Sequence, residues 1–277
     1  MPELPEVEAV KRGLDQSIVG KRVTAIEVMW SKIIRHDDIE AFKQSLIGQV
    51  CQRIDRRGKF LLIYFDTHVL LSHLRMEGKY FLCDKEQPVH KHTHVILELD
   101  KQEELRYHDV RKFGRMELLE IGQEFQHPSL TKLGPEPTPA TFSPHVIKEY
   151  LSGRTTAIKN ILLDQRMVAG IGNIYADEIL FDAYVHPEMS AAEITDEEIQ
   201  QLYYSIISIM QAAIKAGGST IRSYTNMFGE AGHYQAYHQV YGKDGESCSR
   251  CGTIIEKTKV GGRGTHFCPN CQRKRGA

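Results

Sequence analysis

Apolar residues follow two different periods along the chain, and the change of period divides it. Near the N-terminus, Val7, Val10 and Leu14 recur at helical spacing behind Pro5, which suits the first turn of a helix. Up to residue 130, short apolar runs bounded by turn residues predict strands at 22–30, 59–65, 69–74, 80–83, 94–99, 104–107 and 115–121. The pattern therefore predicts one helix followed by a sandwich or a barrel-like sheet.

Prolines mark the end of this β-rich part. Five of the ten prolines fall between residues 128 and 144, and proline fits neither a helix interior nor a central strand. Beyond them, a capping box at Thr195–Glu198 begins a helical apolar stripe that ends at Gly217 and Gly218. The predicted organisation is α+β, with an N-terminal domain at 1–133, a linker at 134–147, a helical domain at 148–240 and a small cysteine-bearing module at 241–277.

Charge is balanced over the whole chain but not locally. The net charge of −1 argues against a uniformly basic nucleic-acid-binding protein. Basic residues nevertheless gather at 53–59. They also predominate between 248 and 277, where the sequence contains a single acid, Glu256. Such patches can bind phosphate, although a solvated face is the commoner explanation. No long apolar run or basic leader is present, so we expect no membrane partner and a cytoplasmic location.

Four of the six cysteines have the spacing of a metal site. Cys248 and Cys251 form one CxxC pair, Cys268 and Cys271 form the second, and sixteen residues separate the two pairs. Four thiolates fill the tetrahedral shell of zinc, which predicts one structural Zn²⁺ with no open position. Paired disulfides or redox motifs are the alternatives, and the expected compartment disfavours both. The insert at 252–267 predicts a hairpin whose tip combines glycines with cations.

The first six residues can form a reactive terminus. Removal of Met1 would leave Pro2 with a secondary amine, and a terminal amine titrates near 7.7–8.0 in the general case, far below lysine. Glu3 and Glu6 lie within four residues of that nitrogen and could move protons. The alternative is an ordinary helix start at a frayed terminus.

Three further segments have the composition of nucleic-acid contacts. Residues 169–178 place glycines and Asn173 ahead of a helix, where backbone amides can hold an anion, with Lys159 upstream; a tight turn between helices is equally compatible. Residues 108–115 and 72–78 interleave cations with Phe113 and Met76, as in proteins that wedge beside bases, although each can be a plain strand end. Cys51 and Cys83 are expected to be small buried side chains, and the histidines at 92, 94 and 108 are expected to be structural.

Taken together, these segments resemble the bacterial formamidopyrimidine-DNA glycosylase family along the whole chain. The matching motifs are Pro2–Glu6, Arg57–Phe60, Asp109–Gly114, Leu133–Pro137, Gly170–Glu178 and the cysteine module. The resemblance implies an N-terminal β-sandwich with flanking helices and a C-terminal helix–two-turn–helix domain that ends in a zinc-finger β-hairpin. It also implies a repair enzyme that removes oxidised purines such as 8-oxoguanine and formamidopyrimidines from duplex DNA and then cleaves the abasic strand by β,δ-elimination.

The resemblance further implies catalytic roles for five residues. Pro2 would attack C1′ and form a Schiff base, Glu3 would protonate the sugar ring oxygen, and Glu6 would position the sugar. Lys59 would be the second proton donor, and Arg263, at the hairpin tip, would serve δ-elimination and bind phosphate.

The DNA contacts implied by the resemblance fall into two groups. Met76, Arg111 and Phe113 would fill the gap left by the flipped nucleotide, with Arg111 bonded to the orphaned cytosine. The backbone path would be lined by His92, Arg154, Lys159, Asn173, Tyr237 and Lys257. Residues 219–239 would form a lid over the damaged base. Lys112 replaces the commoner arginine, which should matter little. The expected state is a monomer acting at the nucleoid.

Three other assignments remain open at this point. The endonuclease VIII branch shares the terminus but prefers oxidised pyrimidines, and the set of Met76, Arg111 and Phe113 favours the purine branch. A non-catalytic DNA-binding protein would not need Pro2 and Lys59 together. A structural zinc protein would leave the basic hairpin tip unexplained.

Overall fold

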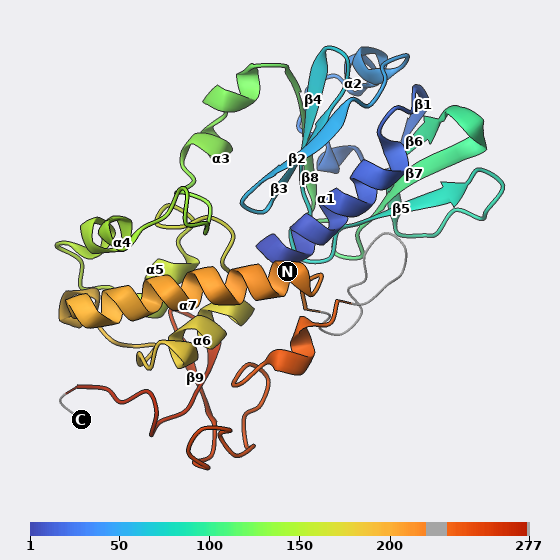
Figure 1. Ribbon diagram of the computed structural model, residues 1–277. Helices are drawn as coiled ribbons and strands as arrows, with labels where there is room; N and C mark the ends of the chain where they lie inside the picture. Colours follow the sequence, from blue (N-terminus) through green and yellow to red (C-terminus); the bar gives the residue numbers. More distant parts are fainter. Residues whose placement is uncertain (220–231, 276–277) are drawn as a thin grey trace. The chain divides into compact units, whose positions relative to one another are not determined.

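The computed structural model describes residues 1–219 and 232–275, and it divides the chain into two compact units. The N-terminal unit comprises Met1–Thr131 together with Ala216–His233. The C-terminal unit comprises Lys132–Lys215 together with Tyr234–Ala277. The two units are described separately below (Figure 1).

Two four-stranded antiparallel sheets and one long helix build the N-terminal unit (Figure 1). One sheet has the strand order β1-β6-β7-β5 and the other has the order β2-β3-β4-β8. The strands are β1 (Val23–Val28), β2 (Arg53–Arg57), β3 (Phe60–Tyr64), β4 (His68–His73), β5 (Lys79–Asp84), β6 (Thr93–Leu99), β7 (Glu103–His108) and β8 (Arg115–Glu120). Both sheets and helix α1 (Leu4–Ile18) contribute side chains to one core, which confirms the predicted sandwich.

Helix α1 forms where the sequence pattern predicts it. Pro5 lies in its first turn, and Val7, Val10 and Leu14 are buried against the sheets. Because these three positions recur every three to four residues, they form one apolar stripe. The helix is therefore held along its length by the sandwich core, which fixes the position of its first turn.

Two elements of this unit were not predicted from the sequence. Helix α2 (Ile39–Leu46) buries only Phe42 and Leu46, so its apolar stripe is too short to show a period. Strand β2 contains four charged residues around a single buried isoleucine, because it lies at the edge of its sheet. Cys83 is only half-buried, contrary to expectation, since β5 is also an edge strand.

The C-terminal unit is helical and ends in a two-stranded hairpin. Its helices are α4 (Pro144–Leu151), α5 (Ile158–Leu163), α6 (Asn173–Asp182) and α7 (Asp196–Lys215), and its strands are β9 (Glu256–Val260) and β10 (Arg263–Phe267). The short α3 (Pro128–Thr131) precedes them. Thr195 and Glu198 form the expected capping box at α7, with distances of 2.8 and 3.3 Å between backbone nitrogen and side-chain oxygen.

Helix α6 is the centre of this unit. Every residue from Ile174 to Phe181 is buried, including Asp177 and Glu178, so the helix has no solvent-exposed face over this stretch and shows no amphipathic stripe. The cysteine module packs on it through Val240, Cys248, Ile255 and Cys268 around Phe181. In the described part of the chain, no helix is both long and apolar enough to cross a membrane.

Candidate functional site

The N-terminal segment is held by the carboxylate of Glu6. Its Oε2 accepts a hydrogen bond from the backbone nitrogen of Glu3 at 2.8 Å, and its Oε1 accepts one from the backbone nitrogen of Ser219 at 2.7 Å. Glu3 and Glu6 also form the capping box that begins α1. Both side chains are buried, so these bonds fix the backbone next to Pro2, which is itself buried.

Charged groups surround the terminal amine. Burial lowers the pKa of the Met1 α-amino group, while Glu3 and Glu6 act in the opposite direction and Lys59 acts in the same direction as burial. Lys59 is almost fully enclosed at the two-residue turn between β2 and β3. The predicted nucleophile, the two carboxylates and the predicted proton donor therefore lie together. A terminal amine whose pKa is lowered, beside two carboxyl groups and a lysine, can perform nucleophilic and proton-transfer steps.

The sheet β2-β3-β4-β8 brings the remaining predicted residues of this unit to the same edge. Phe60, next to Lys59, pairs with His73 at the end of β4, and His73 pairs with Arg115 at the start of β8. Met76 follows β4 and Phe113 precedes β8, so their loops leave the sheet beside Lys59. Residues far apart in the sequence thus share one edge because the register of the sheet places them there.

Asp109 shapes the loop that carries Arg111 and Phe113. Its fully buried carboxylate accepts hydrogen bonds from the backbone nitrogens of Arg111, Phe113 and Gly114 at 3.0, 2.8 and 2.7 Å. With the backbone wrapped around this acid, both side chains point outward, and Phe113 is 47% exposed. The Arg111 guanidinium lies 4.7 Å from the Phe113 ring centroid. An exposed aromatic residue on a rigid loop is suited to insertion between bases.

Tyr107 fixes this loop against the one that carries Met76. A Cβ added to Gly114 would lie 1.8 Å from the Tyr107 hydroxyl oxygen, and one added to Gly78 would lie 2.2 Å from the same atom. Both glycines are therefore required for the phenol to fit between the two loops. Met76 itself is half-buried. The sequence motifs contain these glycines, but only the fold shows that one tyrosine contacts both.

His92 lies beside the same loop, because its carbonyl oxygen accepts a hydrogen bond from the backbone nitrogen of Asp109 at 3.0 Å. Desolvation and the neighbouring Lys91 lower the pKa of His92. A nearby anion favours the protonated form of an imidazole that lies among cations, so His92 is suited to contact a phosphate. His94 bonds to the carbonyl oxygen of Asp109 through Nε2 at 2.7 Å, in agreement with a structural role.

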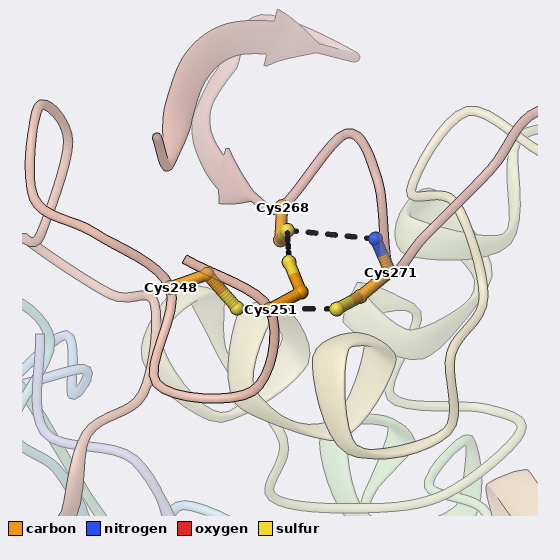
Figure 2. A group of neighbouring side chains, drawn as sticks. All are labelled: Cys248, Cys251, Cys268 and Cys271. Atoms are coloured by element: carbon orange, nitrogen blue, oxygen red, sulfur yellow. Dashed lines mark hydrogen bonds between the residues drawn. The ribbon is translucent and has the colours of Figure 1, made fainter. Parts of the chain in front are cut away.

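The four cysteines of the C-terminal unit converge as predicted (Figure 2). The sulfur atoms of Cys248 and Cys271 are 3.9 Å apart, those of Cys251 and Cys268 are 3.5 Å apart, and all four lie within 4.8 Å of one another. Four sulfur donors at these separations match the tetrahedral thiolate shell of zinc. In the described part of the chain, this is the cluster of His, Cys, Asp and Glu side chains that could hold a metal ion.

The predicted hairpin is formed by β9 and β10. Gly261 and Gly262 both have positive φ values, 55° and 76°, as a two-residue hairpin turn requires. Arg263, the first residue of β10, is exposed beside this turn. The carbonyl oxygen of Gly264 accepts hydrogen bonds from Lys159 Nζ at 2.9 Å and from Asn173 Nδ2 at 3.0 Å. Helices α5 and α6 therefore hold the backbone next to Arg263.

The structure places Lys159 inside the C-terminal unit, in contrast to the surface position expected of a DNA contact. Its side chain is 0% exposed, and its Nζ lies 2.6 Å from Asp177 Oδ1 and 2.7 Å from Thr265 Oγ1. Asp177 is equally enclosed and also accepts a hydrogen bond from the backbone nitrogen of His266 at 2.9 Å. No local pattern predicts this pair, because its members come from two helices.

Glu178, which the sequence analysis gave no role, fixes the chain before the cysteine module. Its carboxylate accepts hydrogen bonds from the backbone nitrogens of Gln239, Val240 and Tyr241 at 2.8, 3.0 and 2.8 Å. Burial raises the pKa of Glu178, and these amides oppose the shift. Tyr237, close before this anchor, is 62% exposed.

Two other predicted contacts are exposed cations of the C-terminal unit. Arg154 follows α4, with its guanidinium 4.3 Å from the ring centroid of Tyr150. Lys257 projects from β9, and its Nζ lies 3.5 Å from Asp244. Of the predicted lid at 219–239, residues 220–231 lie outside the described part of the chain.

Comparison with known proteins accounts for nearly the whole chain. Residues 1–116 match the model of the formamidopyrimidine-DNA glycosylase N-terminal domain, and residues 133–225 match the model of the formamidopyrimidine-DNA glycosylase H2TH domain. Residues 245–273 match the zinc finger found in FPG and IleRS.

Individual members of this family are similar to the chain over nearly their full length. The chain is 52% identical to the formamidopyrimidine-DNA glycosylase of Latilactobacillus sakei over 100% of both chains, and 50% identical to that of Bacillus cereus over 98% of this chain and 99% of the relative. A crystal structure of a Lactococcus lactis FPG variant with a Fapy-dG containing DNA has a TM-score of 0.95 at 46% identity, covering 99% and 100% of the two chains. The Lactococcus lactis protein with an abasic site containing DNA has a TM-score of 0.94 at 46% identity, covering 98% and 100%.

Proposed function

The chain belongs to the formamidopyrimidine-DNA glycosylase family, and from this premise we propose how its own residues carry out the repair reaction. The protein is a DNA glycosylase that removes oxidised purines in base-excision repair and cleaves the resulting abasic strand. The observation that carries the residue assignment is the enclosed N-terminus, where Glu3, Glu6 and Lys59 surround the amine next to Pro2.

Pro2 is the nucleophile of the proposed reaction once Met1 has been removed. The secondary amine of Pro2 attacks C1′ of the damaged nucleotide, the glycosidic bond breaks, and its electron pair leaves with the base. The attacking nitrogen loses its own proton, and Glu3 supplies a proton to the sugar ring oxygen, so the ring C1′–O bond breaks and the C1′–nitrogen bond becomes an iminium. Burial lowers the pKa of the Met1 α-amino group at this terminus, and the same burial is expected to favour the neutral, nucleophilic form of the Pro2 amine.

Strand cleavage follows from the iminium. It withdraws electrons from C2′, so a C2′ proton is lost and the 3′ phosphate leaves in β-elimination. Lys59 transfers protons during base loss and this step, which its enclosed position beside the amine supports. Arg263 binds the phosphate that leaves in the subsequent δ-elimination; its exposed place at the hairpin turn supports this role.

Access to the damaged nucleotide requires that it leave the stack. Met76 and Phe113 fill the resulting gap, and Arg111 bonds the unpaired cytosine, because the loops held by Asp109 and Tyr107 present these side chains together. The phosphate contacts in our proposal are Arg154, Tyr237 and Lys257, which are exposed, and His92, which is half-buried. Asn173 contributes beside Gly264, whose carbonyl oxygen accepts its hydrogen bond.

Zn²⁺ has a structural role in this proposal. The four converging sulfur atoms of Cys248, Cys251, Cys268 and Cys271 fit the ion, which when bound cross-links the two chain segments that carry them. No catalytic step passes through it, because the amine and the acids complete the reaction. We further propose that the protein acts as a monomer, since one chain supplies every assigned residue, and that it works in the cytoplasm at the nucleoid.

Borohydride trapping tests the assignment. Purified protein whose loss of Met1 is verified by mass spectrometry is incubated with duplex DNA that carries 8-oxoguanine opposite cytosine, and borohydride then reduces the iminium to a stable adduct. We expect one covalent adduct per chain, attached at Pro2. Failure to trap with such protein would refute the Schiff-base mechanism. A parallel reaction with oxidised thymine tests the endonuclease VIII alternative, in which that substrate reacts faster.

Two variants give the controls. Pro2→Glu retains Met1, because methionine is not removed before a large acidic residue, so trapping should be lost while DNA binding persists. Cys248→Ser should lose zinc and weaken DNA binding, and the N-terminal unit should keep its fold.

A further inference from the structure

The chain returns to the N-terminal unit directly after helix α7. Residues 216–219 and 232–233 belong to that unit, and the backbone nitrogen of His233 donates a hydrogen bond to the carbonyl oxygen of Ala216 at 3.0 Å. A Cβ added to Gly232 would lie 2.3 Å from the carbonyl oxygen of Gly218. The two stretches are therefore in backbone contact, and we call them together the neck.

The neck lies directly on the carboxylate of Glu6. Ser219 donates its backbone N–H to Glu6 Oε1 at 2.7 Å, and a Cβ added to the preceding Gly218 would lie 2.6 Å from that oxygen and 2.9 Å from Glu6 Cγ. Distances this short are essentially absent between a real Cβ and its neighbours. Only a residue without a side chain permits the neck to approach this closely.

Glu6 connects the neck to the reactive terminus. Its second oxygen, Oε2, accepts the hydrogen bond from the backbone nitrogen of Glu3 at 2.8 Å. The carboxylate is buried, so it has little room to move away from a group pressed against Oε1. A displacement of Glu6 at the neck would consequently be passed to the backbone of Glu3 and to Pro2.

We propose that Gly218 is a positioning residue for the catalytic terminus: its missing side chain lets the neck hold Glu6, and Glu6 in turn holds Glu3 and Pro2 in place. This inference rests on the roles proposed above for Pro2, Glu3 and Glu6. Gly218 contacts no reacting atom and acts through the carboxylate alone. The consequence is that attack on C1′ depends on the neck, whereas DNA binding does not.

The adjacent glycine offers a matched control. Gly217 and Gly218 have φ values of 74° and 81°, so alanine introduces the same kind of backbone strain at either position. At Gly217, however, the nearest atom to an added Cβ is Gly232 Cα at 4.0 Å, which is an ordinary contact. The variants Gly217→Ala and Gly218→Ala therefore differ mainly in the collision with Glu6.

The first measurement is the rate of borohydride trapping on abasic-site DNA with enzyme in excess. We expect the trapping rate of Gly218→Ala to be roughly tenfold to a hundredfold lower than that of Gly217→Ala, because a small displacement of the attacking nitrogen has an effect of this size. The Kd of each variant for duplex DNA with a tetrahydrofuran abasic analogue should stay within about threefold of the other. Equal trapping rates in the two variants would overturn the proposal, and so would a loss confined to binding.

The second measurement does not require activity. Hydrogen–deuterium exchange of the peptide that contains Glu3 reports the bond from its N–H to Glu6, and exchange should be faster in Gly218→Ala than in Gly217→Ala. Unchanged exchange refutes the positioning role even if the enzyme is slow. If the unmodified enzyme fails to trap while the exchange difference is present, the proposed catalytic roles fail and the connection from the neck to Glu3 stands.

Discussion

The buried pair of Lys159 and Asp177 permits a quantitative test of how the hairpin is held. Both side chains are 0% exposed, and their charged atoms are 2.6 Å apart. In Lys159→Met the side-chain volume is nearly kept, but Asp177 loses its counter-charge inside the protein. Removal of one partner of a buried pair costs about 3–5 kcal/mol, a large part of the roughly 5–15 kcal/mol that stabilises a typical domain.

The assay is equilibrium urea denaturation at constant free zinc, with fluorescence or exchange readouts for the C-terminal unit. We expect Lys159→Met to lower the free energy of unfolding by about 3–5 kcal/mol. The double variant Lys159→Met with Asp177→Asn should recover part of that loss, because no uncompensated charge remains. A loss below about 1 kcal/mol in the single variant, or strictly additive losses in the double variant, would refute this account of the pair.

The salt dependence of DNA binding separates an internal role from a phosphate contact. Each neutralised phosphate contributes about 0.9 to the slope of log K against log salt concentration. The variant Lys257→Met, which removes an exposed cation of β9, should reduce the slope by about that amount. Lys159→Met should weaken binding without changing the slope, since its ammonium is bonded to the hairpin and to Asp177. A reduced slope for Lys159→Met would mean that this lysine contacts DNA directly.

Three other outcomes follow from the structure. Burial lowers the pKa of His73 to about 3, whereas its value in the unfolded chain is near 6.5. The contribution of His73 to stability is therefore complete above pH 6.5 and is lost as the pH falls toward 3. His73→Gln should make the melting temperature depend less on pH between pH 7 and pH 5. Gly114→Ala should impair base excision because its Cβ would lie 1.8 Å from the Tyr107 hydroxyl oxygen and 2.7 Å from Tyr107 Cζ. Adding Tyr107→Leu, which removes both atoms, should restore part of the activity, as measured by single-turnover excision. Cys271→Ser should abolish the binding of one zinc per chain, measured by metal analysis after gel filtration, and retention of stoichiometric zinc would contradict the four-sulfur site.

The sequence predicted best those features that depend on local spacing. The first helix behind Pro5, the capping box at Thr195, the paired cysteines and the glycine-containing tip of the hairpin are all set within a few residues, and the structure confirms each of them. Resemblance then supplied roles that spacing alone left open, such as that of Lys59 at a turn between strands.

A side chain's environment could not be predicted from the sequence where distant segments build it. Lys159 was predicted only as part of a phosphate-binding segment, and Asp177 and the hairpin enclose its side chain. The close contact between Gly218 and Glu6 involves residues more than two hundred positions apart, so no local pattern predicts it. Edge strand β2 was missed because four of its five residues are charged, and Arg56 among them is paired with Glu8 of helix α1 at 2.9 Å rather than packed as part of an apolar run.

Buried carboxylates that bind backbone amides recur throughout the molecule and bear on its charge. Glu6, Asp109, Asp177 and Glu178 each accept hydrogen bonds from the backbone of a functional segment. Among the side chains that the structure describes, the buried charged residues comprise seven Asp or Glu and three Lys or Arg. Acids enclosed in this way are neutralised locally by amides or a paired cation, so they repel DNA less than surface acids do. The net charge of −1 therefore understates how basic the surface is, which resolves the apparent conflict between an almost neutral chain and a protein that binds a polyanion.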